Sequence, residues 1–383
     1  MNPLSNKEKS LSVDREQQFK AYTVILGVIV AIIAFFAFRY EPTSGMDLAQ
    51  YYTQVESGNV DHYGIDVYGD VQNADLVITF VMKNLVKYGF SSHVLGFLSA
   101  VLYFGLISKI SLLWTRFRAI RTSPLVLFFI FIFSGYFLAF TGIRYGNACL
   151  ILILSLIYFE LGRVRVSVSL SLLAFCMHFS LLPVIAIFWG AVLLPRWFVC
   201  VGALLLICLT PWMLVIMQKA QSLFFAVGGV FAPIAQKMDV YIFESYGVLP
   251  TVVRFLISGD TNVVIGAFWA GSRWWVGIGL VSCVVLGLLV FSLRREQKVI
   301  FQKLPSEKFF PLLLAYMIFT IEAPAIPMRT MMIVRFLVIL TLLPMVHYPK
   351  AFLSRFYFFS IALLALLATL SGQEVVSFVL GGN

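Results

Sequence analysis

Arginine side chains stand at places in this sequence where a positive charge is costly. Arg144 lies in the stretch TGIRYG between two apolar runs, with no acidic residue near it in the sequence. Arg335 lies within another apolar run, about 9 Å along a helix from Arg329 at 1.5 Å per residue. Arginines in such settings are rare and usually face a cavity or a partner. Because a guanidinium group fits phosphate oxygens well, these arginines, together with Arg254, favour binding of a polyanion such as a lipid diphosphate.

A simpler interpretation applies to each arginine taken alone. Long basic side chains near helix ends often extend to the membrane surface with their charge in water. Glu322 and Asp260 are further candidates as ion-pair partners. The sequence leaves both interpretations open.

Asp47 and Tyr51 lie four residues apart in the acidic stretch 39–73, so that a helix would place them on one face. A carboxylate beside a hydroxyl can act as a general base, and tyrosine rings suit the faces of sugars. The acids lack the spacing of an EF-hand calcium loop. The alternative is a solvated acidic loop without a chemical role.

His178 lies in AFCMHFSLLP, inside an apolar run that also contains Pro183. An imidazole beside a cavity is the commonest general base, although a lone histidine in an apolar run is more often a packed core residue. His62, His93 and His347 are dispersed and lack metal-ligand spacing with it, so we interpret them as structural or solvated.

The composition indicates a helical protein of the membrane. Of the 383 residues, 61% are hydrophobic and 12% are charged, whereas soluble domains average about 25% charged residues. The net charge of +10 is best explained by basic loops at the cytoplasmic face, and nucleic acid is not expected as a partner. All five cysteines lie in apolar runs without metal-ligand spacing, so neither disulfides nor a zinc site is expected.

Apolar runs of roughly 20 residues predict an all-α polytopic protein with about ten or eleven membrane spans. The expected spans lie near 21–38, 93–114, 123–142, 145–161, 166–194, 198–217, 273–293, 309–327, 330–346 and 356–372. The run 166–194 is expected to be two short helices broken near His178–Pro183. Segment 74–90 is expected to be an amphipathic helix at the membrane surface, with a full span as the alternative.

The distribution of basic residues orients the chain. With the N-terminus inside, the basic clusters 115–122, 162–165, 294–298 and 347–355 face the cytoplasm. The predicted organisation is a cytoplasmic tail 1–20, one membrane domain 21–372 with outer loops near 39–73 and 218–272, and an outer tail 373–383. Arg144 then faces the outside.

Four stretches of the sequence resemble a known family. SGMDLAQYY resembles the G-x-D-x-x-x-Y pattern of EpsG-like, Wzy-type polysaccharide polymerases, and FTGIRYGNACLILILSLIYFELGRVR resembles their arginine-led span. AFCMHFSLLPVIAIF and MRTMMIVRFLVIL resemble their histidine segment and their late arginine-bearing span. Order and spacing agree, most closely over about 40–200.

The resemblance implies a GT-C-like glycosyltransferase of the bacterial cytoplasmic membrane, with its active site at the outer, periplasmic face. Such enzymes transfer a glycan from undecaprenyl diphosphate onto another lipid-linked repeat unit. The sequence contains no DxD motif that would present a divalent metal, so neither a metal nor a cofactor is expected. Arg144 and Arg335, assisted by Arg329 or Arg254, would hold the diphosphate. His178 or Asp47 would be the catalytic base, and Tyr51 would bind the acceptor.

Two other functions stay open at this point. A flippase or transporter of lipid-linked saccharides would also need charges, but along many spans and often with internal repeats. A membrane O-acyltransferase could use His178, but the Asp47–Tyr51 pattern is not expected there. The expected partners are the lipid-linked glycan donor and acceptor and membrane lipid, and the resemblance alone suggests a membrane protein that regulates chain length.

Overall fold

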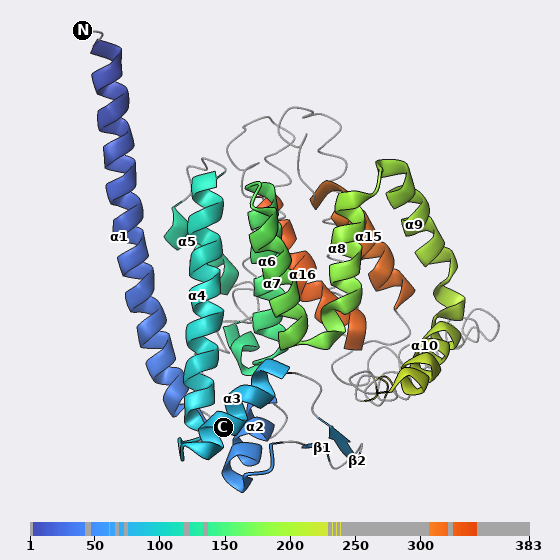
Figure 1. Ribbon diagram of the computed structural model, residues 1–383. Coiled ribbons are helices and arrows are strands. Elements are labelled where there is room, and N and C mark those ends of the chain that lie inside the picture. The colour runs from blue at the N-terminus through green and yellow to red at the C-terminus, as the bar shows by residue number, and fades with distance from the viewer. Residues whose placement is uncertain are drawn as a thin grey trace, which may run out of the picture. The chain divides into compact units, whose positions relative to one another are not determined.

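The computed structural model describes mainly the N-terminal 60% of the chain and two later helices (Figure 1). The described ranges are 3–42, 47–60, 62–65, 69–72, 76–117, 123–132, 137–228, 306–320 and 325–342, with isolated positions up to 238. The predicted spans 273–293 and 356–372 lie outside these ranges.

The described elements are helical, as the sequence predicts, except for one hairpin. In the hairpin, β1 (His62–Ile65) pairs antiparallel with β2 (Gly69–Gln72). The hairpin lies inside the acidic stretch 39–73 and was not expected. By its internal contacts the chain divides into two compact units, which are described separately. The first comprises 1–60, 80–170 and 342–383, and the second comprises 61–79 and 171–341.

The first unit is organised around α4 (His93–Phe117), which packs along α1 (Pro3–Arg39). Figure 1 shows the two helices side by side. Ala34 and Ala37 of α1 and Ala100 of α4 are fully buried. Such small side chains let two helix backbones approach closely. Helix α1 begins at Pro3 and therefore includes most of the predicted tail 1–20, whose cytoplasmic location stays a prediction.

Two further helices of this unit, α5 (Pro124–Ile132) and α6 (Tyr145–Glu160), pack against α4. The predicted helix over 123–142 is wrong in its last part, because Phe137–Thr141 forms the 3-10 helix η1. Ser99 of α4 donates a hydrogen bond to the carbonyl oxygen of Phe140 at 2.6 Å. Asn147 of α6 donates to the Ser99 hydroxyl at 3.1 Å. These buried polar contacts fix the turn that leads into α6.

Gly146→Ala is expected to disrupt this turn. A β-carbon at Gly146 would collide with the backbone carbonyl of Ala139, which cannot move as a flexible side chain does. Overpacking of this kind typically costs about 1–3 kcal/mol. Gly105→Ala in α4 is the matched control, since nothing lies within 4 Å of its β-carbon. Thermal unfolding in detergent should show a lower midpoint for Gly146→Ala alone. Equal midpoints for the two variants would contradict the packing at this turn.

In the second unit, the chain breaks at His178 as predicted. Helix α7 (Val164–Met177), which starts in the first unit, ends there, and η2 (Phe179–Leu181) leads into α8 (Leu182–Leu193). His178 itself is extended, with φ −154° and ψ 107°. Pro183 lies at the start of α8, where its missing N–H costs least.

The predicted single span 198–217 is wrong. Helix α9 (Arg196–Cys208) ends before η3 (Thr210–Trp212), and α10 (Met213–Val227) follows. Pro211 explains the interruption, because its ring cannot donate the helical hydrogen bond and crowds the preceding turn.

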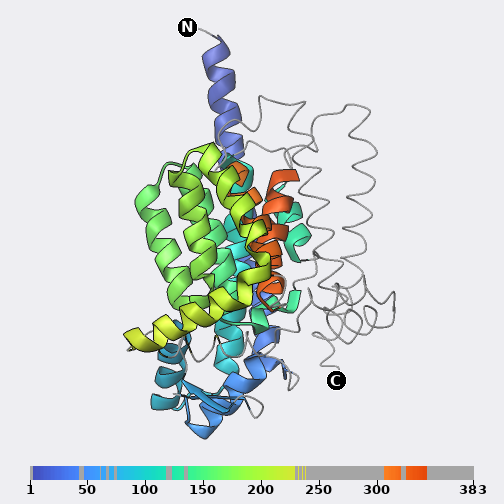
Figure 2. The same ribbon diagram turned by 90° about the vertical axis from the view of Figure 1, so that its right-hand side faces the viewer.

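Helix α15 (Ser306–Phe319) packs against α8 and α9 within the same unit. The rings of Phe188 and Phe309 meet edge to face, with centroids 5.6 Å apart. Helix α16 (Ala325–Leu342) overlaps the predicted span 330–346, but it begins at Ala325, within the predicted span 309–327. Both helices are orange in Figure 2.

Helix α3 (Leu76–Lys87) agrees with the amphipathic helix predicted over 74–90. It buries Ile78, Met82 and Leu85, which are spaced as one face, and exposes Leu76 and Phe80. Its place at a membrane surface stays a prediction.

Within the described part of the chain, two helical stretches are long and apolar enough to cross a bilayer. They are Glu16–Arg39 and His93–Arg116. The shorter apolar helices of the same part of the chain, from Tyr145–Glu160 to Val215–Val227, have 10–17 residues each.

Candidate functional site

Helix α2 (Asp47–Ser57) carries two of the predicted site residues on its buried side. Leu48, Tyr52 and Val55 form an apolar stripe, and all three are buried. Asp47 and Tyr51 lie on the neighbouring stripe, as the spacing of four predicts. Asp47 also opens the helix, where a negative charge interacts favourably with the helix dipole.

Arg144 meets both of these residues. Its Nη2 lies 3.5 Å from Oδ2 of Asp47, and its guanidinium carbon lies 5.2 Å from the centre of the Tyr51 ring. The Arg144 side chain is 6% exposed, whereas that of Asp47 is 36% exposed. Three predicted site residues from two distant segments therefore come together in the first unit.

The ion-pair partner of Arg144 is neither of the two acids that the sequence suggested. Glu322 and Asp260 lie outside the described residues, and the acid at Arg144 is Asp47. The ion pair joins Nη2 of Arg144 to a single carboxylate oxygen of Asp47. Arg144 is also the N-cap of α6, where the positive end of the helix dipole adds to its charge. This end of α6 suits an anionic ligand.

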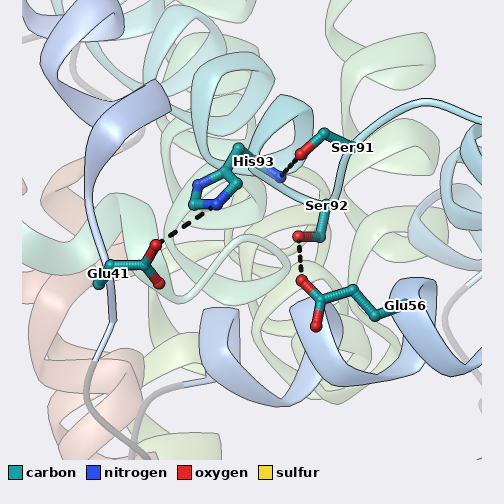
Figure 3. A network of polar contacts seen from close by, with 5 residues as sticks. All are labelled: Glu41, Glu56, Ser91, Ser92 and His93. Atoms are coloured by element: carbon teal, nitrogen blue, oxygen red, sulfur yellow. Dashed lines mark hydrogen bonds and ion pairs between the residues drawn. The ribbon is translucent and has the colours of Figure 1, made fainter.

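Two polar contacts join the start of α4 to α2 and to Glu41, which follows the end of α1 (Figure 3). Glu56 of α2 accepts a hydrogen bond of 2.7 Å from the Ser92 hydroxyl. His93, the first residue of α4, has Nε2 3.4 Å from Oε1 of Glu41. The His93 ring also packs against the Tyr52 ring, with centroids 5.0 Å apart. His93 is thus a structural residue, one of the two roles expected for it.

Burial raises the pKa of the Tyr52 phenol well above its ordinary value, and the nearby carboxylates of Glu41 and Glu56 raise it further. The phenol therefore keeps its proton at neutral pH. Tyr52 packs α2 onto α4, and it does not serve as a base.

Gly96→Ala tests how closely α2 must sit on α4. Its β-carbon would lie 2.5 Å from the Tyr52 hydroxyl and 2.9 Å from the Ala37 carbonyl oxygen. We expect α2 to shift and the protein to lose about 1–3 kcal/mol of stability, because overpacking strains a well-packed contact. Adding Tyr52→Phe removes the nearest clashing atom and should restore part of that stability. The thermal unfolding midpoints of the single and double variants, with Tyr52→Phe alone as control, measure this. An unchanged midpoint for Gly96→Ala would contradict the close packing.

The second unit holds the other predicted residues. His178 is 3% exposed at the helix break, with Nδ1 3.5 Å from the Ser180 hydroxyl and its ring 5.6 Å from that of Phe179. Arg335 is half-buried in α16, and Arg329 lies in the second turn of the same helix. Arg254 lies outside the described residues.

No three His, Cys, Asp or Glu side chains of the described ranges are grouped so that they could hold a metal ion. Comparisons with protein-family models, with curated proteins and with solved structures find no match to this chain.

The sequence analysis did not predict the Glu41–His93 and Ser92–Glu56 contacts. The local signal for them is the triplet Ser91-Ser92-His93 before an apolar run. Serine side chains at such positions accept hydrogen bonds from the free backbone N–H groups at the start of a helix.

Proposed function

We propose that this chain is a multi-pass membrane glycosyltransferase of the EpsG-like, Wzy type. It would polymerise undecaprenyl-diphosphate-linked oligosaccharide repeat units at the outer face of the bacterial cytoplasmic membrane, with a GT-C-like fold. The observation that supports this function is the meeting of Arg144, Asp47 and Tyr51. Two of the four family-like stretches contribute these residues.

The surface of α1 supports a membrane location. Val24, Val28, Ile32 and Phe35 follow one another along one side of the helix and are each more than half exposed. A continuous apolar strip of this kind would be costly in water and is suited to lipid chains. In the second unit, α9 also exposes apolar side chains, among them Trp197.

The proposed reaction joins two lipid-linked glycans. A hydroxyl oxygen of the acceptor attacks the anomeric carbon of the donor glycan. The bond from that carbon to the diphosphate oxygen breaks, the lipid diphosphate leaves with the electron pair, and the hydroxyl proton passes to a base. Arg144, buried and fixed at the start of α6, would stabilise the charge that grows on the diphosphate.

Asp47 and His178 are the two candidates for the base. Asp47 is partly exposed and lies on the same helical face as Tyr51. This position suits a carboxylate that accepts the proton of the acceptor hydroxyl. Its pairing with Arg144 fits a positioning role equally well. His178 is buried at a helix break and would be the base if Asp47 only positions the acceptor.

The proposal is tested by incubating the purified protein in detergent with a synthetic short lipid-diphosphate repeat unit. A ladder of products on a gel is expected. If repeat units of several chemistries give no ladder, while the same lipid crosses liposomes that contain the protein, the chain is a transporter and the proposal fails.

A further inference from the structure

The polar stripe of α2 continues beyond the residues that the sequence singled out. Asp47, Gln50, Tyr51 and Gln54 follow the spacing of one helical face, at i, i+3, i+4 and i+7. Gln54 is only 8% exposed. The stripe therefore brings two amide side chains onto the same face as the Asp47–Arg144 ion pair.

The side-chain oxygens of Gln50 and Gln54 are buried, and neither has a hydrogen-bond partner in the part of the chain that the structure describes. Buried polar atoms almost always have a partner, and a buried acceptor without one is costly. Thr53, on the exposed side of the same helix, has its hydroxyl bonded to the Ala49 carbonyl oxygen. Two of the unsatisfied acceptors of α2, the amide oxygens of Gln50 and Gln54, thus lie on the stripe that also carries Asp47, and the Tyr52 hydroxyl lies on the apolar stripe.

The chemistry of this stripe selects its ligand. Each glutamine side chain carries a carbonyl oxygen that accepts hydrogen bonds and an NH2 group that donates them, which suits hydroxyl groups because a hydroxyl can do both. One helical turn separates Gln50 from Gln54, about 6 Å along the axis, which suits two hydroxyls of one sugar or of adjoining sugars.

We propose that Gln50 and Gln54 form a saccharide subsite that binds the hydroxyls of the acceptor glycan. Its role as the acceptor subsite rests on the proposed polymerase function. Hydroxyl binding itself can be measured without any catalysis.

Gln54→Leu separates this subsite from a structural role. Replacing an unsatisfied buried amide by an apolar side chain of similar size should leave the thermal unfolding midpoint unchanged or raise it. Sugar binding should fall at the same time by about tenfold or more, because an acceptor is lost. Gln54→Glu keeps a side-chain acceptor oxygen at this position and should retain more binding than Gln54→Leu. Thr53→Leu is the matched control on the exposed side of α2.

The probe is an array of lipid-free oligosaccharides with neutral, acidic and amino-sugar termini, incubated with labelled full-length protein in detergent. We expect wild type and Thr53→Leu to bind the same glycans, Gln54→Leu to bind them weakly, and Gln54→Leu to be at least as stable as wild type. Binding of no glycan by wild type, or equal binding by wild type and Gln54→Leu, would overturn the subsite. Glycan binding by a protein that forms no polymer would instead retain the subsite and reject the polymerase.

Discussion

Arg144→Ala is expected to lower the rate of polymer formation by about 10²–10³-fold, the usual loss when one fixed electrostatic donor is removed. The guanidinium is buried, anchored at the start of α6, and already close to Asp47 and Tyr51. Water that enters in its place would have to reorganise as charge grows on the diphosphate. The rate of ladder formation from the lipid-diphosphate repeat unit measures the effect.

Arg163→Ala is the matched control for this variant. Arg163 also lies over a tyrosine ring, with its guanidinium carbon 6.0 Å from the centre of Tyr158, but it is exposed and belongs to a predicted cytoplasmic cluster. Its removal should leave the rate within about twofold of wild type, because exposed charges contribute little. Arg144→Lys keeps the charge but loses the planar fork, and should be intermediate. A folded Arg144→Ala protein with normal activity would remove Arg144 from the site.

Asp47→Asn and His178→Ala, compared side by side, should separate the base from its positioning partner. Loss of the base is expected to lower the rate by about 10²–10⁴-fold, whereas loss of a positioning residue mainly raises KM for the acceptor. Removing the base should also abolish the acidic limb of the pH–rate profile, and removing a positioning residue should leave that limb in place. Rates of both variants at saturating acceptor, over a range of pH, measure the difference.

Either assignment is open to contradiction in this comparison. If neither variant loses the acidic limb, the base is a third group. If both variants retain normal rates and normal KM, neither residue belongs to the reaction. Thermal unfolding of both variants serves as the folding control, because His178 is buried at a helix break.

Local rules were enough to predict the helical class and the break at His178. Pro183 interrupts the helix that begins at Val164, and a single span over 166–194 would have placed the basic cluster 294–298 outside. The same proline rule applied to Pro211 would have divided the predicted span 198–217, but that run had the length of a single span and was not divided. Apolar length predicts that a segment is helical more reliably than it predicts where a helix ends.

The site could be predicted in part only. The spacing of Asp47 and Tyr51 is local, so their shared face could be expected from a helix alone. The pairing of Asp47 with Arg144 is a tertiary contact, and no local pattern in either segment specifies it. The buried oxygens of Gln50 and Gln54 were equally hidden, because glutamine in an acidic stretch suggests exposure to water.

The most direct measurement is a count of the lipid released per glycosidic bond formed, by mass spectrometry of a reaction that contains only purified protein, lipid-linked repeat unit and detergent. We expect one undecaprenyl diphosphate for each bond, with loss of both products in Arg144→Ala. Release of undecaprenyl monophosphate, or bond formation without any released lipid, would contradict a polymerase that uses a lipid-diphosphate donor.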